Sequence, residues 1–384
     1  MKKESNILLA PDSFKESMTA KEVCDAMEKG IRRVDEDINC IKIPMADGGE
    51  GTMQSLVDAT GGSVYKLKVM GPLGNEVEAE YGILGDGKTG IIEMASASGI
   101  ALIHQEDRNP LVTTTYGTGQ LIKACLDRGI KKLLIGIGGS ATNDGGAGVV
   151  QALGGKLKDK FGKEIGFGGG ELRKLSSIDL SEFDERIKEV EVEVACDVTN
   201  PLCGDNGASN VFGPQKGADS EMIKILDDNL RHYASIIKNQ LGMDVLNIPG
   251  AGAAGGLGAG LMVFLNGKLE AGIDIVIKYS NLEENIKTAD LVFTGEGSID
   301  FQTQYGKTPM GVAMMAKKYD KPVIVLAGSI GKDIEALYEK GIDSIFSIVQ
   351  GVTNLDNALE NGSKNVEKTM ENIIRLIKLN NCKM

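Results

Sequence analysis

The stretch Gly136-Ile-Gly-Gly-Ser-Ala-Thr-Asn-Asp-Gly-Gly-Ala-Gly148 follows a strand-like run at 131–135 and precedes a helical run at 149–153. Glycines clear side chains from the path of a ligand, and free N–H groups at a helix start supply partial positive charge. A tight turn with an aspartate cap is the simpler interpretation, but such a turn needs one or two glycines and this loop contains six. We therefore expect an anion site here, with Ser140 and Thr142 as donors and Asp144 as a carboxylate for a metal ion or a hydroxyl proton.

The composition limits the classes of function. The chain has 384 residues, enough for two domains, and its 51 glycines are about twice the usual share. They cluster at the ends of strand-like runs, as ligand-facing loops would require. A net charge of −12 argues against nucleic acid and anionic membranes as partners.

The six cysteines show no CxxC spacing and the N-terminus lacks a signal-peptide core, so we expect reduced thiols and a cytoplasmic protein. No apolar run approaches the length of a membrane span. With two histidines in all, a histidine-based metal site or a Ser/His/Asp triad is poorly supported.

Both ends of the chain alternate strand-like and helical runs, whereas the middle contains period-two hairpins, as at 64–69 and 77–81. We predict an α/β protein in which residues 1–62 and 287–384 form a parallel-sheet domain. Residues 63–286 form an inserted mixed α/β domain, with the active site in the cleft between the two.

The stretch Gly82-Ile-Leu-Gly-Asp-Gly-Lys-Thr89 matches the P-loop pattern letter for letter. A P-loop must open a helix, but the residues after Thr89 continue as a strand, so we interpret the match as a hairpin turn.

Polar residues recur at the predicted strand ends, in the company of glycines. Each aspartate alone is best explained as a cap or turn residue, but several on loops of one type indicate a site for Mg²⁺ and phosphate. These charged residues are Asp12, Lys15, Asp47, Asp144, Asp197, Glu296 and Asp300. Two features stay open: the threonines at 113–115 could cap a helix or hold an anion, and the glycine cluster at 249–260 could serve helix packing or cradle a phosphate.

Eight motifs resemble the type 1 glycerate kinases, in order and over nearly the whole chain. They are Ala10-Pro-Asp-Ser-Phe-Lys-Glu-Ser, Pro44-Met-Ala-Asp-Gly-Gly-Glu-Gly-Thr, the 136–148 loop, Ala195-Cys-Asp-Val-Thr-Asn-Pro-Leu, Gly213-Pro-Gln-Lys-Gly-Ala, the 249–260 loop, Thr294-Gly-Glu-Gly-Ser-Ile-Asp and Gly306-Lys-Thr-Pro. The chain departs from the family at Glu16, where glycine is usual. The resemblance implies a flavodoxin-like domain with a second α/β domain inserted. It also implies ATP-dependent phosphorylation of D-glycerate, on the 2-hydroxyl, to give 2-phosphoglycerate and ADP.

The resemblance suggests roles for particular residues. We expect Asp197 to be the base that takes the hydroxyl proton, with Asp47 as the second choice, and Lys15 to neutralise charge in catalysis. The predicted substrate-binding residues are Asp12, Ser13, Lys216, Asn200 and Asn143. The predicted nucleotide- and phosphate-binding residues are Gly138, Gly139, Ser140, Thr142, Gly252, Gly255, Gly256 and Lys307. The predicted metal ligands are Glu296, Asp300 and Asp144.

Other functions remain as alternatives. The enzyme could phosphorylate the 3-hydroxyl or act on a related hydroxy acid. Gly136-Ile-Gly-Gly-Ser-Ala141 also matches a dinucleotide fingerprint, but the dehydrogenase that it suggests would need a buried strand where residues 154–162 offer a poor one. A non-catalytic sensor of an anionic metabolite is the third class. We expect ATP, Mg²⁺ and glycerate as ligands, and a monomer or homodimer.

Overall fold

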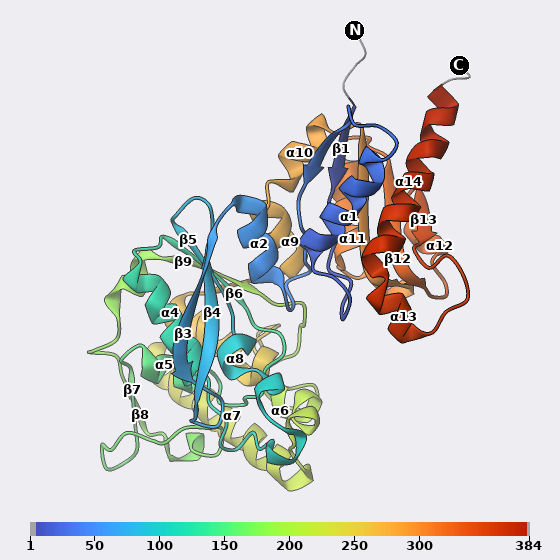
Figure 1. Cartoon of the computed structure of the whole chain (residues 1–384). Coiled ribbons are helices and arrows are strands. Elements are labelled where there is room, and N and C mark those ends of the chain that lie inside the picture. The colour runs from blue at the N-terminus through green and yellow to red at the C-terminus, as the bar shows by residue number, and fades with distance from the viewer. Residues whose placement is uncertain (1–4, 382–384) are drawn as a thin grey trace. The chain divides into compact units, whose positions relative to one another are not determined.

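The computed structural model describes residues 5–381, which divide into two compact units (Figure 1). Of the described residues, 5–47, 54–61 and 273–381 form the first, here called the parallel-sheet unit. Gly48–Met53 and Gly62–Gly272 form the second, the mixed-sheet unit. No helix in the described range is long and apolar enough to cross a membrane.

The parallel-sheet unit is built on five parallel strands. They are β1 (Asn6–Leu9), β2 (Asn39–Lys42), β11 (Leu291–Ile299), β12 (Val323–Ile330) and β13 (Ser344–Ser347). Their order in the sheet is β13-β12-β11-β1-β2, and β1 pairs with both β2 and β11 in parallel. Counted along the chain this is the order 2-1-3-4-5 of flavodoxin, in which ligands bind at the carboxyl ends of the strands.

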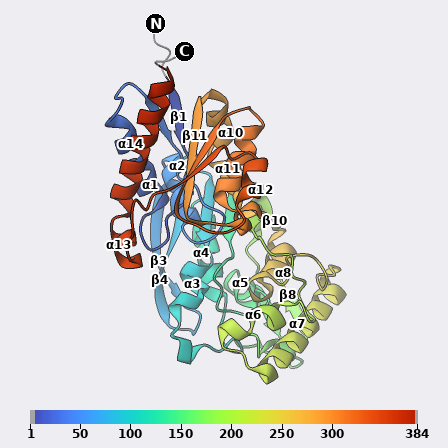
Figure 2. The same ribbon diagram turned by 90° about the vertical axis from the view of Figure 1, so that its right-hand side faces the viewer.

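Helices cover both faces of this sheet. On one face, α1 (Ala20–Arg32) packs against α14 (Gly362–Asn381), and on the other lie α10 (Leu282–Thr288) and α11 (Thr308–Lys317) (Figure 2). A capping box of Thr19 and Glu22 begins α1. Gly30 allows the close approach of α1 and α14, because a Cβ at this position would lie 2.3 Å from the carbonyl oxygen of Glu367.

The mixed-sheet unit contains six strands in the order β10-β9-β6-β5-β4-β3. The hairpin strands β3 (Ser63–Met70) and β4 (Glu76–Ile83) are antiparallel, as are β4 and β5 (Thr89–Glu93). The remaining strands, β6 (Lys132–Gly136), β9 (Glu191–Ala195) and β10 (Lys268–Glu270), continue the sheet in parallel. The parallel-sheet and mixed α/β fold class is therefore confirmed. The stretch 82–89, which matches the P-loop pattern, contains the turn between β4 and β5. There the Asp86 carboxylate accepts from the backbone N–H groups of Lys88 and Thr89.

The helices of the mixed-sheet unit pack on this sheet and on one another. They are α3 (Ala95–Ser98), α4 (Tyr116–Asp127), α5 (Ala147–Ala152), α6 (Ala208–Phe212), α7 (Ser220–Leu241) and α8 (Ala253–Leu265). The apolar stripe of α7 is buried at Leu226, Leu230, Tyr233 and Ile237, whereas Leu241 at its end is exposed. A small antiparallel pair, β7 (Lys156–Lys158) and β8 (Ser177–Asp179), stands apart from the main sheet.

Two boundaries that the sequence suggests differ from those of the structure. The apolar run at 291–294 predicts a strand that ends before Gly295, but β11 continues to Ile299 because β12 pairs with it as far as Ile330, and this places Glu296 on the strand itself. The stretch 357–377 predicts one helix, but the structure has two, α13 (Leu355–Glu360) and α14, which are separated at Asn361. The remaining helices are α2 (Thr52–Thr60), α9 (Gly272–Tyr279) and α12 (Glu335–Glu339).

Candidate active site

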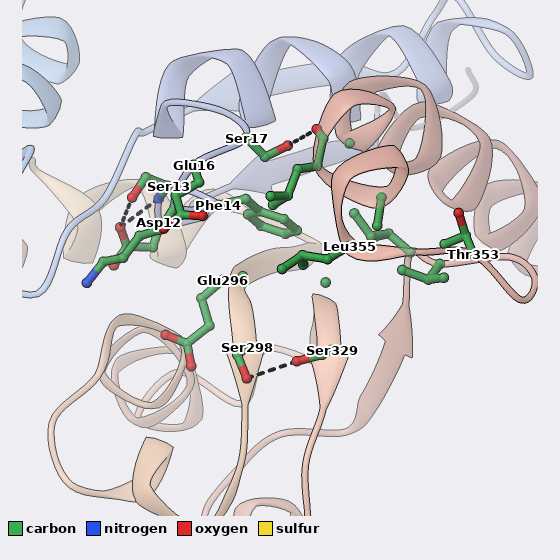
Figure 3. A pocket seen from close by; sticks show the side chains of 18 of the residues that line it. Asp12, Ser13, Phe14, Glu16, Ser17, Glu296, Ser298, Ser329, Thr353 and Leu355 are labelled. Atoms are coloured by element: carbon green, nitrogen blue, oxygen red, sulfur yellow. Dashed lines mark hydrogen bonds between the residues drawn. The ribbon is translucent and has the colours of Figure 1, made fainter.

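The parallel-sheet unit contains a cavity of about 570 Å³ at the carboxyl ends of its strands (Figure 3). Six predicted site residues line it: Asp12, Ser13, Lys15, Asp47, Glu296 and Lys307. They come from the segments that follow β1, β2 and η6 (Phe301–Gln304) and from β11. The topology thus brings together residues that are almost 300 positions apart in the chain.

Asp12 lies on the loop that follows β1, and hydrogen bonds hold its side chain in place. One carboxylate oxygen accepts from the backbone N–H of Ser13 at 2.6 Å, and the other accepts from the Thr308 hydroxyl at 2.5 Å. Burial raises the pKa of Asp12 to about 6, and the neighbouring charge of Asp47 adds to the rise, although both hydrogen bonds oppose it.

Glu296 lies on β11 and is buried, with 8% of its surface exposed. Its Oε1 accepts from the Thr303 hydroxyl at 3.1 Å and from Lys307 Nζ at 3.3 Å. Burial raises its pKa to about 7; Lys307 lowers it, and the negative charge of Asp12 raises it further. The cavity therefore holds carboxylates that repel one another, an arrangement that a bound cation would stabilise.

Asp300 lies outside this cavity lining and caps a short helix. Its side chain accepts from the backbone N–H of Gln302 at 2.8 Å at the start of η6, and it forms a capping box with Thr303. Among residues 5–381, no three His, Cys, Asp or Glu side chains form a group that could hold a metal ion by themselves. Glu296 and Asp300 therefore do not form such a group with a third residue of their own unit, and the metal-ligand set of Glu296, Asp300 and Asp144 stays a prediction.

Asp144 is buried in the mixed-sheet unit, with 0% of its surface exposed. Its carboxylate accepts from the N–H and the hydroxyl of Thr115 at 2.8 and 2.9 Å, and from the N–H groups of Gly146 and Gly148 at 3.1 and 3.2 Å. Burial raises its pKa, and these hydrogen bonds oppose the rise. The chain itself supplies hydrogen-bond donors to both oxygens, so Asp144 holds the loop together in this structure. Its role as a metal ligand stays a prediction.

Lys216 points into the glycine-rich loop at 136–148. Only 2% of its surface is exposed, and Nζ donates to the Ser140 hydroxyl at 2.5 Å and to the Thr142 carbonyl at 2.6 Å. Burial lowers the pKa of this lysine to about 7, and the charge of Asp144 offsets part of the effect. The neighbouring Asn143 donates to the Ser209 hydroxyl at 3.0 Å.

The glycines of the 249–260 cluster serve close backbone packing. A Cβ at Gly255 would lie 1.9 Å from the Thr142 carbonyl oxygen, one at Gly252 would lie 2.2 Å from that of Pro201, and one at Gly256 would lie 2.8 Å from Leu202. In the 136–148 loop, by contrast, a Cβ at Gly138 would meet nothing within 4 Å, and one at Gly139 would meet Ala95 at 3.4 Å. Close packing thus accounts for the glycines of the 249–260 cluster, whereas the start of the 136–148 loop has room beside Gly138 and Gly139.

Two of the three threonines whose role the sequence left open donate hydrogen bonds within the protein. Thr113 donates to the Ala141 carbonyl at 2.9 Å, and Thr115 binds Asp144. The last two predicted residues lie on the loop after β9. Asp197 Oδ1 accepts from the Gly272 N–H at 2.9 Å, and Asn200 donates to the Asn206 carbonyl at 2.8 Å. These two bonds hold the loop.

Sequence reasoning missed the apolar wall of the cavity. It consists of Phe14, Ile348, Val349, Leu355, Ala358 and Leu359. Most of these residues follow β13, where the sequence showed a strand and a helix but no motif. Glu16, which replaces the usual glycine, also lines the cavity, and its φ of 63° is left-handed. A positive φ explains why glycine suits this position.

Known proteins match this chain over nearly its full length. The model of the glycerate kinase family matches residues 7–378. A glycerate kinase from Halalkalibacterium halodurans is 55% identical over 369 residues, which cover 96% of this chain and 97% of that protein. A glycerate 2-kinase from Escherichia coli K12 is 54% identical over 367 residues, 96% of each chain.

A crystal structure from Salmonella typhimurium LT2, assigned provisionally as glycerate kinase 2, superposes with a TM-score of 0.92 at 50% identity. It covers 99% of this chain and 100% of the other. The motifs, the two sheets and these similarities agree, and the chain is a member of the glycerate kinase family.

Proposed function

We propose that this kinase transfers the terminal phosphoryl group of ATP to the 2-hydroxyl of D-glycerate, giving 2-phosphoglycerate and ADP. The observation that carries the proposal is the cavity in the parallel-sheet unit, where Lys15 and Lys307 meet the carboxylates of Asp12, Asp47 and Glu296. Phosphoryl transfer needs bound phosphates, neutralised charge and an acceptor for the hydroxyl proton. The choice of the 2-hydroxyl follows the similarity to the E. coli glycerate 2-kinase.

The two lysines would neutralise phosphate charge. Glu296 is well suited to accept a proton at neutral pH, because its pKa of about 7 matches the working pH of a general base. The proposal therefore moves Glu296 from metal ligand to proton acceptor. Asp197 and Asp47 remain the residues predicted from the sequence for the same role. The sequence-based prediction that residues of both units act together on ATP and glycerate also stands as a proposal.

Mg²⁺ would bind to the triphosphate and to one or two of the cavity carboxylates, the mode that this ion prefers in ATP sites. These residues fit the ion because Asp12 and Asp47 share the cavity and the charge of Asp47 raises the pKa of Asp12, while no closed ligand cage is present among the described residues. The ion would supply charge neutralisation on the transferring group. Asp12 and Asp47 are the residues we propose to hold it.

The other classes receive less support. The segment that a dehydrogenase would need as its second parallel strand is β7, which pairs antiparallel with β8 outside the main sheet. A sensor would gain nothing from carboxylates beside its anion. We propose that the enzyme works in the cytoplasm, where ATP is supplied, as a monomer or homodimer.

The test is incubation with Mg-ATP and D-glycerate, followed by phosphorus and proton NMR to identify the phosphorylated carbon. A phosphate on carbon 2 supports the proposal, and one on carbon 3 identifies the alternative kinase. Saturable binding of glycerate without ADP formation would indicate a sensor, and NADH formation from NAD⁺ and glycerate without ATP would indicate a dehydrogenase.

A further inference from the structure

The cavity of the parallel-sheet unit has two chemically different ends. Figure 3 shows Asp12 and Glu296 at one side of the pocket and Thr353 at the other, with Phe14 and Leu355 between them. The first end carries the carboxylates and lysines of the candidate site. The second is formed by the apolar wall of Phe14, Ile348, Val349, Leu355, Ala358 and Leu359.

The wall combines a rigid floor with an open rim. Phe14 and Ile348 are each 3% exposed and belong to the core of this unit, whereas Leu355 is 69% exposed. The rim helix α13 is fixed at both ends. Asn354 caps it by accepting from the Asn357 N–H at 2.9 Å, and the Ser17 hydroxyl donates to the Leu359 carbonyl at 2.6 Å. The exposed Leu355 on this fixed helix and the buried ring of Phe14 line an apolar slot, into which a flat, apolar group would fit.

We propose that this apolar end binds the adenine base of ATP, so that the nucleotide runs from α13 toward Lys15 and Lys307. The inference rests on the proposed kinase function and adds to it the location of the base. ATP is flat and weakly polar at one end and anionic at the other, and the cavity has the same polarity along its length. A volume of about 570 Å³ falls within the range of small-molecule sites. Glycerate, a three-carbon acid whose carbons all carry oxygen, has no group that would gain from an apolar slot.

This assignment differs from the prediction that glycine-rich loops of the mixed-sheet unit hold the nucleotide phosphates. In those loops the Ser140 hydroxyl and the Thr142 carbonyl accept from Lys216, and Gly255 packs against Thr142. These members of the predicted phosphate cradle are therefore engaged with the protein itself, whereas Gly138 and Gly139 have room beside them. The parallel-sheet unit offers both a charged end and a base-sized slot in one cavity.

Photoaffinity labelling of the full-length wild-type protein tests the location directly. The probe is 8-azido-ATP with Mg²⁺, followed by proteolysis and mass spectrometry. We expect the label on peptides that contain residues 348–359, and we expect excess ATP to remove it. Label that is confined to peptides from 136–148 or 249–260 would overturn the assignment.

A filled-slot variant gives a kinetic test. Ala358 is half-buried and lines the cavity, so Ala358→Phe would occupy the slot. We expect the KM for ATP to rise by about tenfold or more, and the KM for D-glycerate to change by less than about twofold. Glu360→Phe is the matched control, because Glu360 is exposed on the same helix and outside the cavity lining; both constants should stay as in the wild type.

The outcomes separate this inference from the proposed function. A folded Ala358→Phe protein with an unchanged KM for ATP, or with its main change in the KM for glycerate, contradicts the base site. A wild-type protein that makes no phosphoglycerate contradicts the proposed function. In that case the labelling experiment still decides where ATP binds.

Discussion

The Nζ atom of Lys216 lies 2.5 Å from the hydroxyl oxygen of Ser140, although the two residues are 76 positions apart in the chain. The same Nζ binds the carbonyl of Thr142 at 2.6 Å. A lysine that the sequence assigned to an anionic ligand thus holds the glycine-rich loop in its observed conformation. Because burial opposes its charge, this contact should make the stability of the mixed-sheet unit depend on pH.

The first prediction concerns that pH dependence. The pKa of Lys216 is about 7 in the folded protein, against an ordinary lysine value of 10.5. Between these values unfolding takes up a proton, so the free energy of unfolding should rise with pH, by at most about 1.4 kcal/mol per pH unit. Below pH 7 Lys216 is protonated in both the folded and the unfolded state, so the free energy of unfolding is lowered by the full cost of burying the charge.

Urea unfolding of the wild type and of Lys216→Met at several pH values between 6.5 and 10 measures this effect. The difference between the two proteins should grow with pH in favour of the wild type, and thiol ionisation, common to both, cancels in that difference. Lys224→Met, at an exposed position of α7, is the control and should show no such trend. A constant difference would show that Lys216 does not change protonation in this range.

The second prediction separates a structural from a metal-binding role for Asp144. Asp144→Asn keeps the shape of the side chain but replaces an acceptor by a donor that faces N–H groups of the loop. We expect a loss of about 1–3 kcal/mol in the free energy of unfolding. The Mg²⁺ concentration that half-saturates the kinase reaction should stay unchanged. A variant as stable as the wild type that needs much more Mg²⁺ would restore the metal-ligand interpretation.

The third prediction concerns Glu296 as the proton acceptor. With a pKa raised to about 7, its carboxyl becomes an active base as the pH increases. The wild-type kcat/KM should therefore rise with pH through about 7 and fall below it. Glu296→Gln should lower kcat by about 100-fold or more and remove that rise.

The matched control is Glu335→Gln, at an exposed position of the same unit, which should keep the wild-type profile. If Glu296→Gln retains both its turnover and its pH profile, the base is another residue. Asp47→Asn and Asp197→Asn then test the two residues predicted from the sequence.

The fourth prediction concerns the left-handed backbone of Glu16, with a φ of 63°. Glu16→Gly removes a strain of about 1–2 kcal/mol, but glycine loses about 1 kcal/mol through the greater entropy of the unfolded chain. We therefore expect the two changes nearly to cancel, with a net effect on stability within about 1 kcal/mol. Glu16→Val should destabilise the protein clearly, because β-branched residues avoid positive φ. Thermal unfolding of both variants measures the contrast, and equal melting temperatures would show that this φ carries no strain.

Local patterns in the sequence were enough to predict the fold class and several of its details. The capping box at Thr19 and Glu22 and the turn between β4 and β5 depend on neighbouring residues, so they are readable without tertiary structure. Strand-end loops with Asp12, Lys15 and Asp47 were predictable for the same reason. Parallel strands end at one edge of a sheet, and these residues do line one cavity.

Only the tertiary structure decided which way the charged side chains of the other motifs point. Lys216 and Asp144 turn inward, because each finds its hydrogen-bond partners in segments that are distant in the chain or folded back upon it. Glu296 lies on β11 itself, because the pairing of β11 with β12 continues beyond this residue to Ile299. The apolar slot arises where α13 comes to rest beside Phe14, about 340 residues away, and a linear pattern does not contain such a contact. Periodicity and loop chemistry act over a few residues, whereas burial and pairing are properties of the assembled chain.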